Sequence, residues 1–192
     1  MKTKVGGFLW VLATTLFLAT FARAAEVTAF DLVKEGNRYI GEQSKDRVVQ
    51  IRSDKSVGGI TPNIWYVVYY DETASLKAVE VKFGGGKMMD VKRPLRLLEP
   101  IRDRHLELNR KQLKVDSDDA LKKALKEPIL EKLTIKATSM KLENSDNGPV
   151  WKIKLWAAKL KQPTRDVDIG EIHLAAEDGK VVKLDVHIDR VD

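Results

Sequence analysis

The chain has 192 residues, of which 43% are hydrophobic and 32% are charged, and its formal net charge is +6. This composition predicts one folded globular domain or two small ones, and it excludes a disordered or collagen-like chain. Because the sequence contains no cysteine, it excludes disulfide frameworks, thiolate nucleophiles, iron–sulfur clusters and cysteine-ligated zinc.

Residues 1–24 have the pattern of a bacterial export signal. Lys2 and Lys4 precede an uncharged apolar stretch, and Ala22 and Ala24 supply small residues at positions −3 and −1 of a cleavage site. We therefore expect a periplasmic or secreted protein, without a lipid anchor because no cysteine could carry one. The alternative is an uncleaved membrane anchor, since the stretch approaches the roughly 20 apolar residues of a spanning helix.

The basic excess is halved once this segment is removed. The segment holds three basic residues and no acidic ones, so the net charge falls from +6 to +3. The remaining basic residues are interleaved with acidic ones, and no long basic run is present that would follow a phosphate backbone. We therefore predict no nucleic-acid partner.

The next segment, residues 25–93, is expected to contain one helix and four strands. Thr28 and Asp31 resemble the start of a capping box, and Phe30, Val33 and Ile40 form an apolar stripe that extends the helix to about residue 41. Alternating apolar and polar residues predict strands, at 47–52, 64–71, 78–83 and 87–92.

Residues 94–115 read as a linker between two similar halves. They contain prolines and many charges, but also enough leucines to pack on one half or across both. A second helix is expected from Ser117, as its N-cap, to about Glu127, where Pro128 ends it. Alternation predicts strands in residues 116–192, at 133–143, 150–160, 169–176 and 180–188.

The last hairpin allows two registers. A two-residue turn places Ile172 and Leu174 on the face opposite to Val182 and Leu184. A three-residue turn with Gly179 in the left-handed conformation pairs Leu174 with Val182 and Ile172 with Leu184 on one buried face, and we choose it. The same choice for the glycine turn at 84–86 gives matching pairs in the first hairpin, Val81 with Met89 and Val79 with Val91.

The order of helix and four strands therefore occurs twice. Trp65 aligns with Trp151, and the glycine turn ending at Gly86 aligns with the one ending at Gly179. We predict an α+β fold of two tandem repeats, each a helix packed on a four-stranded antiparallel β-sheet, at 25–93 and 116–192.

A strand, a glycine turn and a valine-rich strand follow one another from Ile172 to Val182. With the preceding helix and meander, this pattern resembles PepSY and PepSY-like domains of exported bacterial proteins, well over 115–190 and less well over 28–93. The family occurs in propeptides of secreted metallopeptidases and in envelope proteins, and it is taken to bind or restrain peptidases. Because no peptidase follows the second repeat, the resemblance implies restraint in trans.

Motifs for catalysis or metal binding are incomplete. Gly86 and Lys87 are followed by Met88 rather than the serine or threonine of a phosphate loop. The loop from Asn144 lacks the twelfth-position glutamate of a calcium loop. No nucleophile or metalloprotease motif is present, and His173 and His187 lie too far apart along their hairpin to share an ion. We expect no catalysis, cofactor or metal.

Aromatic residues on one sheet face are the remaining binding candidates. Trp151, Ile153 and Leu155 are expected in the core, which places Lys152, Lys154 and Trp156 on the other face. The aligned positions of the first repeat are Tyr66, Val68 and Tyr70, so this face is apolar in one repeat and mixed in the other. The candidate partner-binding residues are Trp156, Lys152, Lys154, Tyr70 and Tyr66. The alternative, which we favour, is that Tyr70, Val68 and Trp156 pack the repeats or linker together, because a sheet face that carries Tyr66, Val68 and Tyr70 is unfavourable in water.

These observations predict a non-catalytic, exported protein-binding module that restrains a peptidase or assists another envelope protein. Its partner is then an exported or envelope protein, and it contacts a membrane only if residues 1–24 are not cleaved. The alternative is a periplasmic carrier of a small molecule or lipid, with a cleft between the two sheets. A hydrolase would require His105 or His173 to meet a carboxylate in a pocket.

Overall fold

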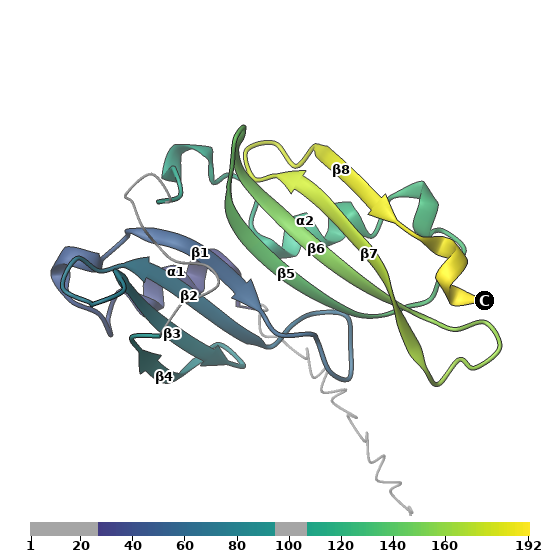
Figure 1. Cartoon of the computed structure of the whole chain (residues 1–192), viewed down its shortest axis with the longest axis horizontal. Coiled ribbons are helices and arrows are strands. Elements are labelled where there is room, and N and C mark those ends of the chain that lie inside the picture. The colour runs from purple at the N-terminus through teal and green to yellow at the C-terminus, as the bar shows by residue number, and fades with distance from the viewer. Residues whose placement is uncertain (1–26, 95–106) are drawn as a thin grey trace, which may run out of the picture.

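The computed structural model describes residues 27–94 and 107–192. The predicted export signal, His105 and most of the predicted linker lie outside the described residues. The described strands form one antiparallel sheet in the order β4-β3-β2-β1-β5-β6-β7-β8 (Figure 1). They are β1 (Val48–Ser53), β2 (Ile64–Tyr70), β3 (Ala78–Gly84), β4 (Lys87–Lys92), β5 (Ile135–Ser145), β6 (Gly148–Ala158), β7 (Asp166–Ala175) and β8 (Val181–Val186).

The prediction of two repeats, each with its own four-stranded sheet, is wrong. β1 pairs antiparallel with β5, with Ile51 opposite Leu142 and Arg52 opposite Lys141. Two separate sheets would expose an unpaired edge at both β1 and β5, and pairing these strands removes both edges. The result is a single eight-stranded sheet with two short α-helices in the described residues.

Both α-helices lie behind the sheet as drawn in Figure 1, so the front face carries no helix. The N-termini of these helices meet: the Ala29 N–H donates to Ser117 Oγ (2.9 Å) and the Phe30 N–H donates to Asp116 Oδ1 (3.2 Å). These bonds satisfy amide groups that a helix start leaves without partners. The helices are α1 (Ala29–Gly36) and α2 (Ser117–Ala124), with turns of 3-10 helix at η1 (Glu42–Ser44), η3 (Arg110–Gln112), η4 (Pro128–Leu130) and η5 (Ile188–Val191).

Both helices are shorter than expected. α1 ends at Gly36, where the Tyr69 hydroxyl donates to the Val33 carbonyl (2.9 Å) and occupies the space that a Cβ at position 36 would need. The N-cap of α2 is Asp116 rather than Ser117, because the Ser117 hydroxyl caps α1 instead.

The core lies between the helices and the sheet and is continuous across β1 and β5. The predicted core face of β6 is confirmed, since Trp151, Ile153 and Leu155 are each 0% exposed. Trp151 Nε1 donates to the Val115 carbonyl (2.9 Å), and Trp65 occupies the corresponding position in β2. Alternation along the strands therefore defines the two faces of the sheet correctly.

The hairpin registers are confirmed only in part. Ile172 pairs with Leu184 as predicted, and Gly179 has a positive φ of 74°. A bulge next to the turn pairs Leu174 with Val181 instead of Val182. The predicted burial of the β8 side chains is wrong, because β8 is an edge strand and Leu184 is 46% exposed.

The first hairpin differs more. Val81 pairs with Val91 rather than with Met89. The turn consists of Gly85 and Gly86 alone, both with positive φ, which suits a two-residue hairpin turn. The register moves by two positions at Val81 and by only one at Phe83, which pairs with Met88, because a bulge lies between these two pairs.

The described part of the predicted linker crosses the sheet. The Leu108 N–H donates to the Val48 carbonyl (2.7 Å), and the Val115 N–H donates to the Ala176 carbonyl (2.9 Å). Leu108 is buried in the core. This segment therefore contacts β1 at one end and the turn between β7 and β8 at the other.

Candidate functional site

The helix-free face of the sheet holds the candidate binding residues. One row of cross-strand partners runs over all the described strands of this face. Its members are Asp90, Lys82, Tyr66, Arg52, Lys141, Lys152, His173 and Lys183. The middle of the row places three cations directly opposite one another, an arrangement that is unfavourable without counter-charges.

Glu143 supplies the counter-charge for this part of the row. Its carboxylate accepts from Lys141 Nζ (2.8 Å) and Lys152 Nζ (2.7 Å), and from Gln50 Nε2 (3.1 Å). Burial raises the pKa of Glu143, but the hydrogen bonds from Lys141 and Lys152 outweigh burial and hold the pKa below its ordinary value. Lys152 is therefore occupied by an ion pair at the centre of the sheet.

Trp156 lies between two lysines. The Nζ atom of Lys55 is 4.8 Å from its ring centroid and that of Lys154 is 5.4 Å away, both within cation–π range. Lys154 also pairs with Asp168 (2.8 Å), and Lys55 pairs with Asp166. The half-buried indole is thus held in place by cations and remains accessible from the helix-free face.

Tyr66 has a similar environment on the other side of the sheet centre. The Arg52 guanidinium lies 3.9 Å from its ring centroid and Lys82 Nζ lies 5.4 Å away. Its hydroxyl donates to Asp54 Oδ2 (3.0 Å). Arg52 in turn pairs with Glu80 (2.9 Å), so the tyrosine belongs to a continuous network of charged groups.

Tyr70 does not face solvent. It is 7% exposed and forms a small apolar cluster on the helix-free face with Val49, Val68 and Ala78. The Arg47 guanidinium lies 4.4 Å from its ring centroid. Tyr70 is therefore a packing residue, and a partner could reach it only if this cluster opened.

A loop that the sequence did not single out lies beside Trp156. Residues 54–63 connect β1 to β2, and Val57 near their middle is 85% exposed, the highest value among the exposed large hydrophobic residues described. The loop approaches Trp156 through Lys55. The only sequence signal was an isolated valine followed by two glycines.

Hydrogen bonds hold this loop against β5. The Ser56 N–H donates to the Thr138 carbonyl (2.8 Å), and the Thr138 N–H donates to Ser56 Oγ (2.9 Å). Thr138 Oγ1 donates to the Ile60 carbonyl (2.6 Å), and Ser56 Oγ donates to the Gly59 carbonyl (2.7 Å). Val57 is therefore exposed on a loop whose two ends are fixed.

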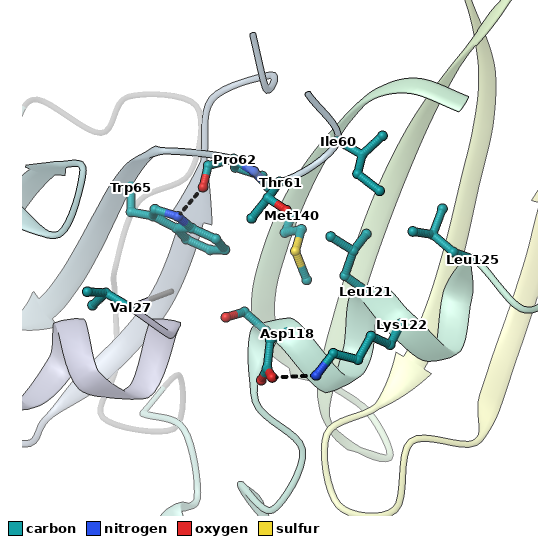
Figure 2. A pocket seen from close by; sticks show the side chains of 11 residues that line it. Val27, Ile60, Thr61, Pro62, Trp65, Asp118, Leu121, Lys122, Leu125 and Met140 are labelled. Atoms are coloured by element: carbon teal, nitrogen blue, oxygen red, sulfur yellow. Dashed lines mark hydrogen bonds and ion pairs between the residues drawn. The ribbon is translucent and has the colours of Figure 1, made fainter. Parts of the chain in front are cut away.

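The helix side of the same loop lines a small pocket, shown in Figure 2. Trp65 and Pro62 lie on one side, Leu121 of α2 and its C-cap Leu125 on the other, with Met140 between them. Its volume is about 140 Å³. A dry cavity of about 150 Å³ holds a benzene molecule, whereas ligand pockets span about 300–1,000 Å³. The pocket therefore accommodates one small apolar group.

The histidines of the described residues have local carboxylate partners. His173 Nε2 lies 2.7 Å from Glu171 Oε1, and His187 Nε2 lies 3.1 Å from Asp185 Oδ1. No group of three or more potential metal ligands occurs within residues 27–94 and 107–192. In the same ranges, no helix has the length and apolar character needed to cross a membrane.

Comparison with family models, with curated proteins and with solved structures finds no match for the chain.

Proposed function

We propose that this protein is a non-catalytic, exported binding module that restrains an envelope peptidase in trans. Its contact surface, the Trp156–loop surface, consists of Trp156, Lys154, Lys55, Val57 and Asp166. Export follows from the N-terminal sequence pattern, and the class of partner follows from the PepSY resemblance.

The observation that carries the proposal is an aliphatic side chain exposed on a fixed loop. Val57 is 85% exposed, and transfer of a valine side chain from water into an apolar pocket contributes about 1.5–3 kcal/mol. Because the loop is already hydrogen-bonded to β5, little further ordering is needed on binding. A rigid loop with a small branched tip suits the substrate pocket of a peptidase.

Trp156 extends the contact beyond the loop tip. Thr138, the partner of Ser56, follows Ala137, the cross-strand neighbour of Trp156. The backbone of Ser56, the residue before Val57, thus lies about two strand spacings, or roughly 10 Å, from that of Trp156. Tryptophan is enriched among residues that dominate interface energies. The two side chains are close enough for one partner to cover both.

The carrier alternative has less support. A single sheet leaves no space between two sheets, which is where a carrier cleft was expected. The pocket beside Trp65 holds about 140 Å³, less than half of the smallest typical ligand pocket. A larger hollow of about 710 Å³, lined by Val57, Ala137 and Asp166, lies open at the surface and belongs to the Trp156–loop surface itself. Binding at the sheet face therefore remains the function that the geometry favours.

The test is capture from the envelope with matched variants. The full chain with a C-terminal tag is expressed in a bacterial host, crosslinked in the envelope and purified, and retained peptidases are assayed for activity. Val57→Asp and Trp156→Ala should each reduce retention of the partner at least tenfold and relieve its inhibition. Met89→Asp, a similar change on the distant strand β4, should leave both unchanged. A peptidase retained equally by all three variants would contradict the proposal, as would a wild-type chain that retains none.

A further inference from the structure

Strand β8 is an edge of the sheet, and the described residues place no strand on its outer side. Three of its apolar side chains are exposed: Val181 (37%), Val182 (57%) and Leu184 (46%). Edge strands with exposed apolar residues readily pair with another chain. The question is which chain fits this edge.

The backbone of β8 offers hydrogen-bonding groups to a new strand. The His187 N–H donates to the Ile169 carbonyl (2.7 Å), and in an antiparallel ladder alternate residues face alternate neighbours. Asp185 and Lys183 therefore direct their backbone groups toward β7, and Leu184 and Val186 direct theirs toward the open edge.

The side chains of β8 are complementary to those of a second β8. If Leu184 faces Leu184 of another copy in an antiparallel pair, Val182 faces Val186 and Lys183 faces Asp185, each twice. The apolar positions lie on the helix face, since Leu184 pairs with Ile172, and the charged positions lie on the helix-free face beside Glu171 and His173. Apolar residues then meet apolar residues, and each cation meets a carboxylate.

We propose that two copies of this chain associate through antiparallel pairing of β8 with β8, which continues the sheet from one copy into the other. This association is independent of the Trp156–loop surface. A two-fold axis at Leu184 gives a closed dimer rather than a filament.

The opposite edge strand, β4, is less complementary to the same strand of a second copy. β4 also exposes Met88, Met89 and Val91. Its charges are matched only around Val91, with Asp90 facing Lys92, and the strand ends at Lys92. The matched length is therefore shorter than in β8, where it runs from Val182 to Val186 and only Val182, which the bulge leaves without a partner in β7, lies outside the regular ladder.

Sedimentation velocity over a concentration series tests the proposal, with the protein purified after expression of the full chain. The wild type should change from monomer to dimer as concentration rises. Lys183→Asp places two carboxylates opposite each other twice, and should raise the dissociation constant about tenfold or more. The double variant Lys183→Asp/Asp185→Lys should restore the dimer, and Asp90→Lys on β4 should leave it unchanged.

The restored dimer separates a lost contact from a misfolded variant. A wild type that stays monomeric up to its solubility limit would overturn the proposal. So would a dimer that tolerates Lys183→Asp, or one that the double variant fails to restore.

Discussion

At Gly170 in β7, a side chain of any size would clash with the backbone of the neighbouring strand β8. The φ of Gly170 is +108°, and a Cβ there would lie 2.0 Å from the Asp185 carbonyl oxygen in β8. Gly170→Ala should therefore lower the free energy of unfolding by at least about 1–3 kcal/mol, the usual cost of a strained backbone position, and weaken the attachment of β8. Urea unfolding followed by circular dichroism measures this loss.

Gly58→Ala is the matched control for this substitution. Gly58 also has a positive φ, +75°, but no atom lies within 4 Å of the position that its Cβ would take. It should show the backbone strain without the clash, and so a smaller loss of stability than Gly170→Ala. Equal losses of unfolding free energy for the two variants would show that β7 and β8 move apart at position 170 without a cost in stability.

Glu143 predicts a dependence of stability on pH. Its pKa in the folded chain is held below the ordinary value of 4.5, because the hydrogen bonds from Lys141 and Lys152 outweigh the effect of burial. Its stabilising contribution is therefore present above about pH 4.5 and is lost as the pH falls through the folded-state pKa. Glu143→Gln should lower the free energy of unfolding by about 1 kcal/mol at pH 7 and by less at pH 3.

Urea midpoints of Glu143→Gln and the wild type at pH 7, 5 and 3 measure this difference. The same substitution at the exposed Glu131 serves as the control and should give a small difference at each pH. A Glu143→Gln difference that stays constant on acidification would contradict the assigned ion pairs.

At the scale of elements, the loop between β1 and β2 depends on Thr138 of β5. Thr138→Val keeps the volume but removes the hydroxyl that donates to the Ile60 carbonyl (2.6 Å). We expect faster amide hydrogen exchange at residues 56–60 and a loss of about 1–2 kcal/mol. Thr134→Val, directly before the start of the same strand, is the control. Unchanged exchange in the loop would mean that Val57 is fixed by other contacts.

The positions of the strands and their two faces could be predicted from alternation alone, because burial on one face imposes that pattern directly. Turn registers could not, since a bulge beside Val181 or a two-glycine turn at Gly85 and Gly86 leaves the apolar pattern unchanged. The end of α1 was set by Tyr69, a residue of another element. The exposed face of β6 was predicted, but the loop that brings Lys55 to Trp156 depends on contacts with β5.

At the scale of the whole molecule, the pairing of β1 with β5 was the main feature that the sequence did not predict. Alternation shows that a segment is a strand but not which strand lies next to it. The hydrogen bonds from the start of α1 to Asp116 and Ser117 are a second connection between the two halves of the chain, and they form only when the halves are side by side. The two helix starts and the two central strands thus join parts of the chain that look independent in sequence.

This joining predicts cooperative unfolding of the whole sheet. Since the core is continuous across β1 and β5, differential scanning calorimetry should show one transition, with equal calorimetric and van't Hoff enthalpies. Asp116→Ala removes a cap shared by both helices and should lower the transition temperature without splitting the peak. Two resolved transitions in the wild type would show that the halves unfold separately.

The pairing of β1 with β5 also sets an order of events in time. The chain is synthesised from its N-terminus, so β1 is complete long before β5 exists. Until then β1 lacks its neighbour on that side. The pairing of β1 with β5 joins residues that are distant in sequence, and such contacts form slowly. These two strands are therefore expected to pair late in folding. Before they do, the chain is most susceptible to proteolysis and to incorrect strand pairing.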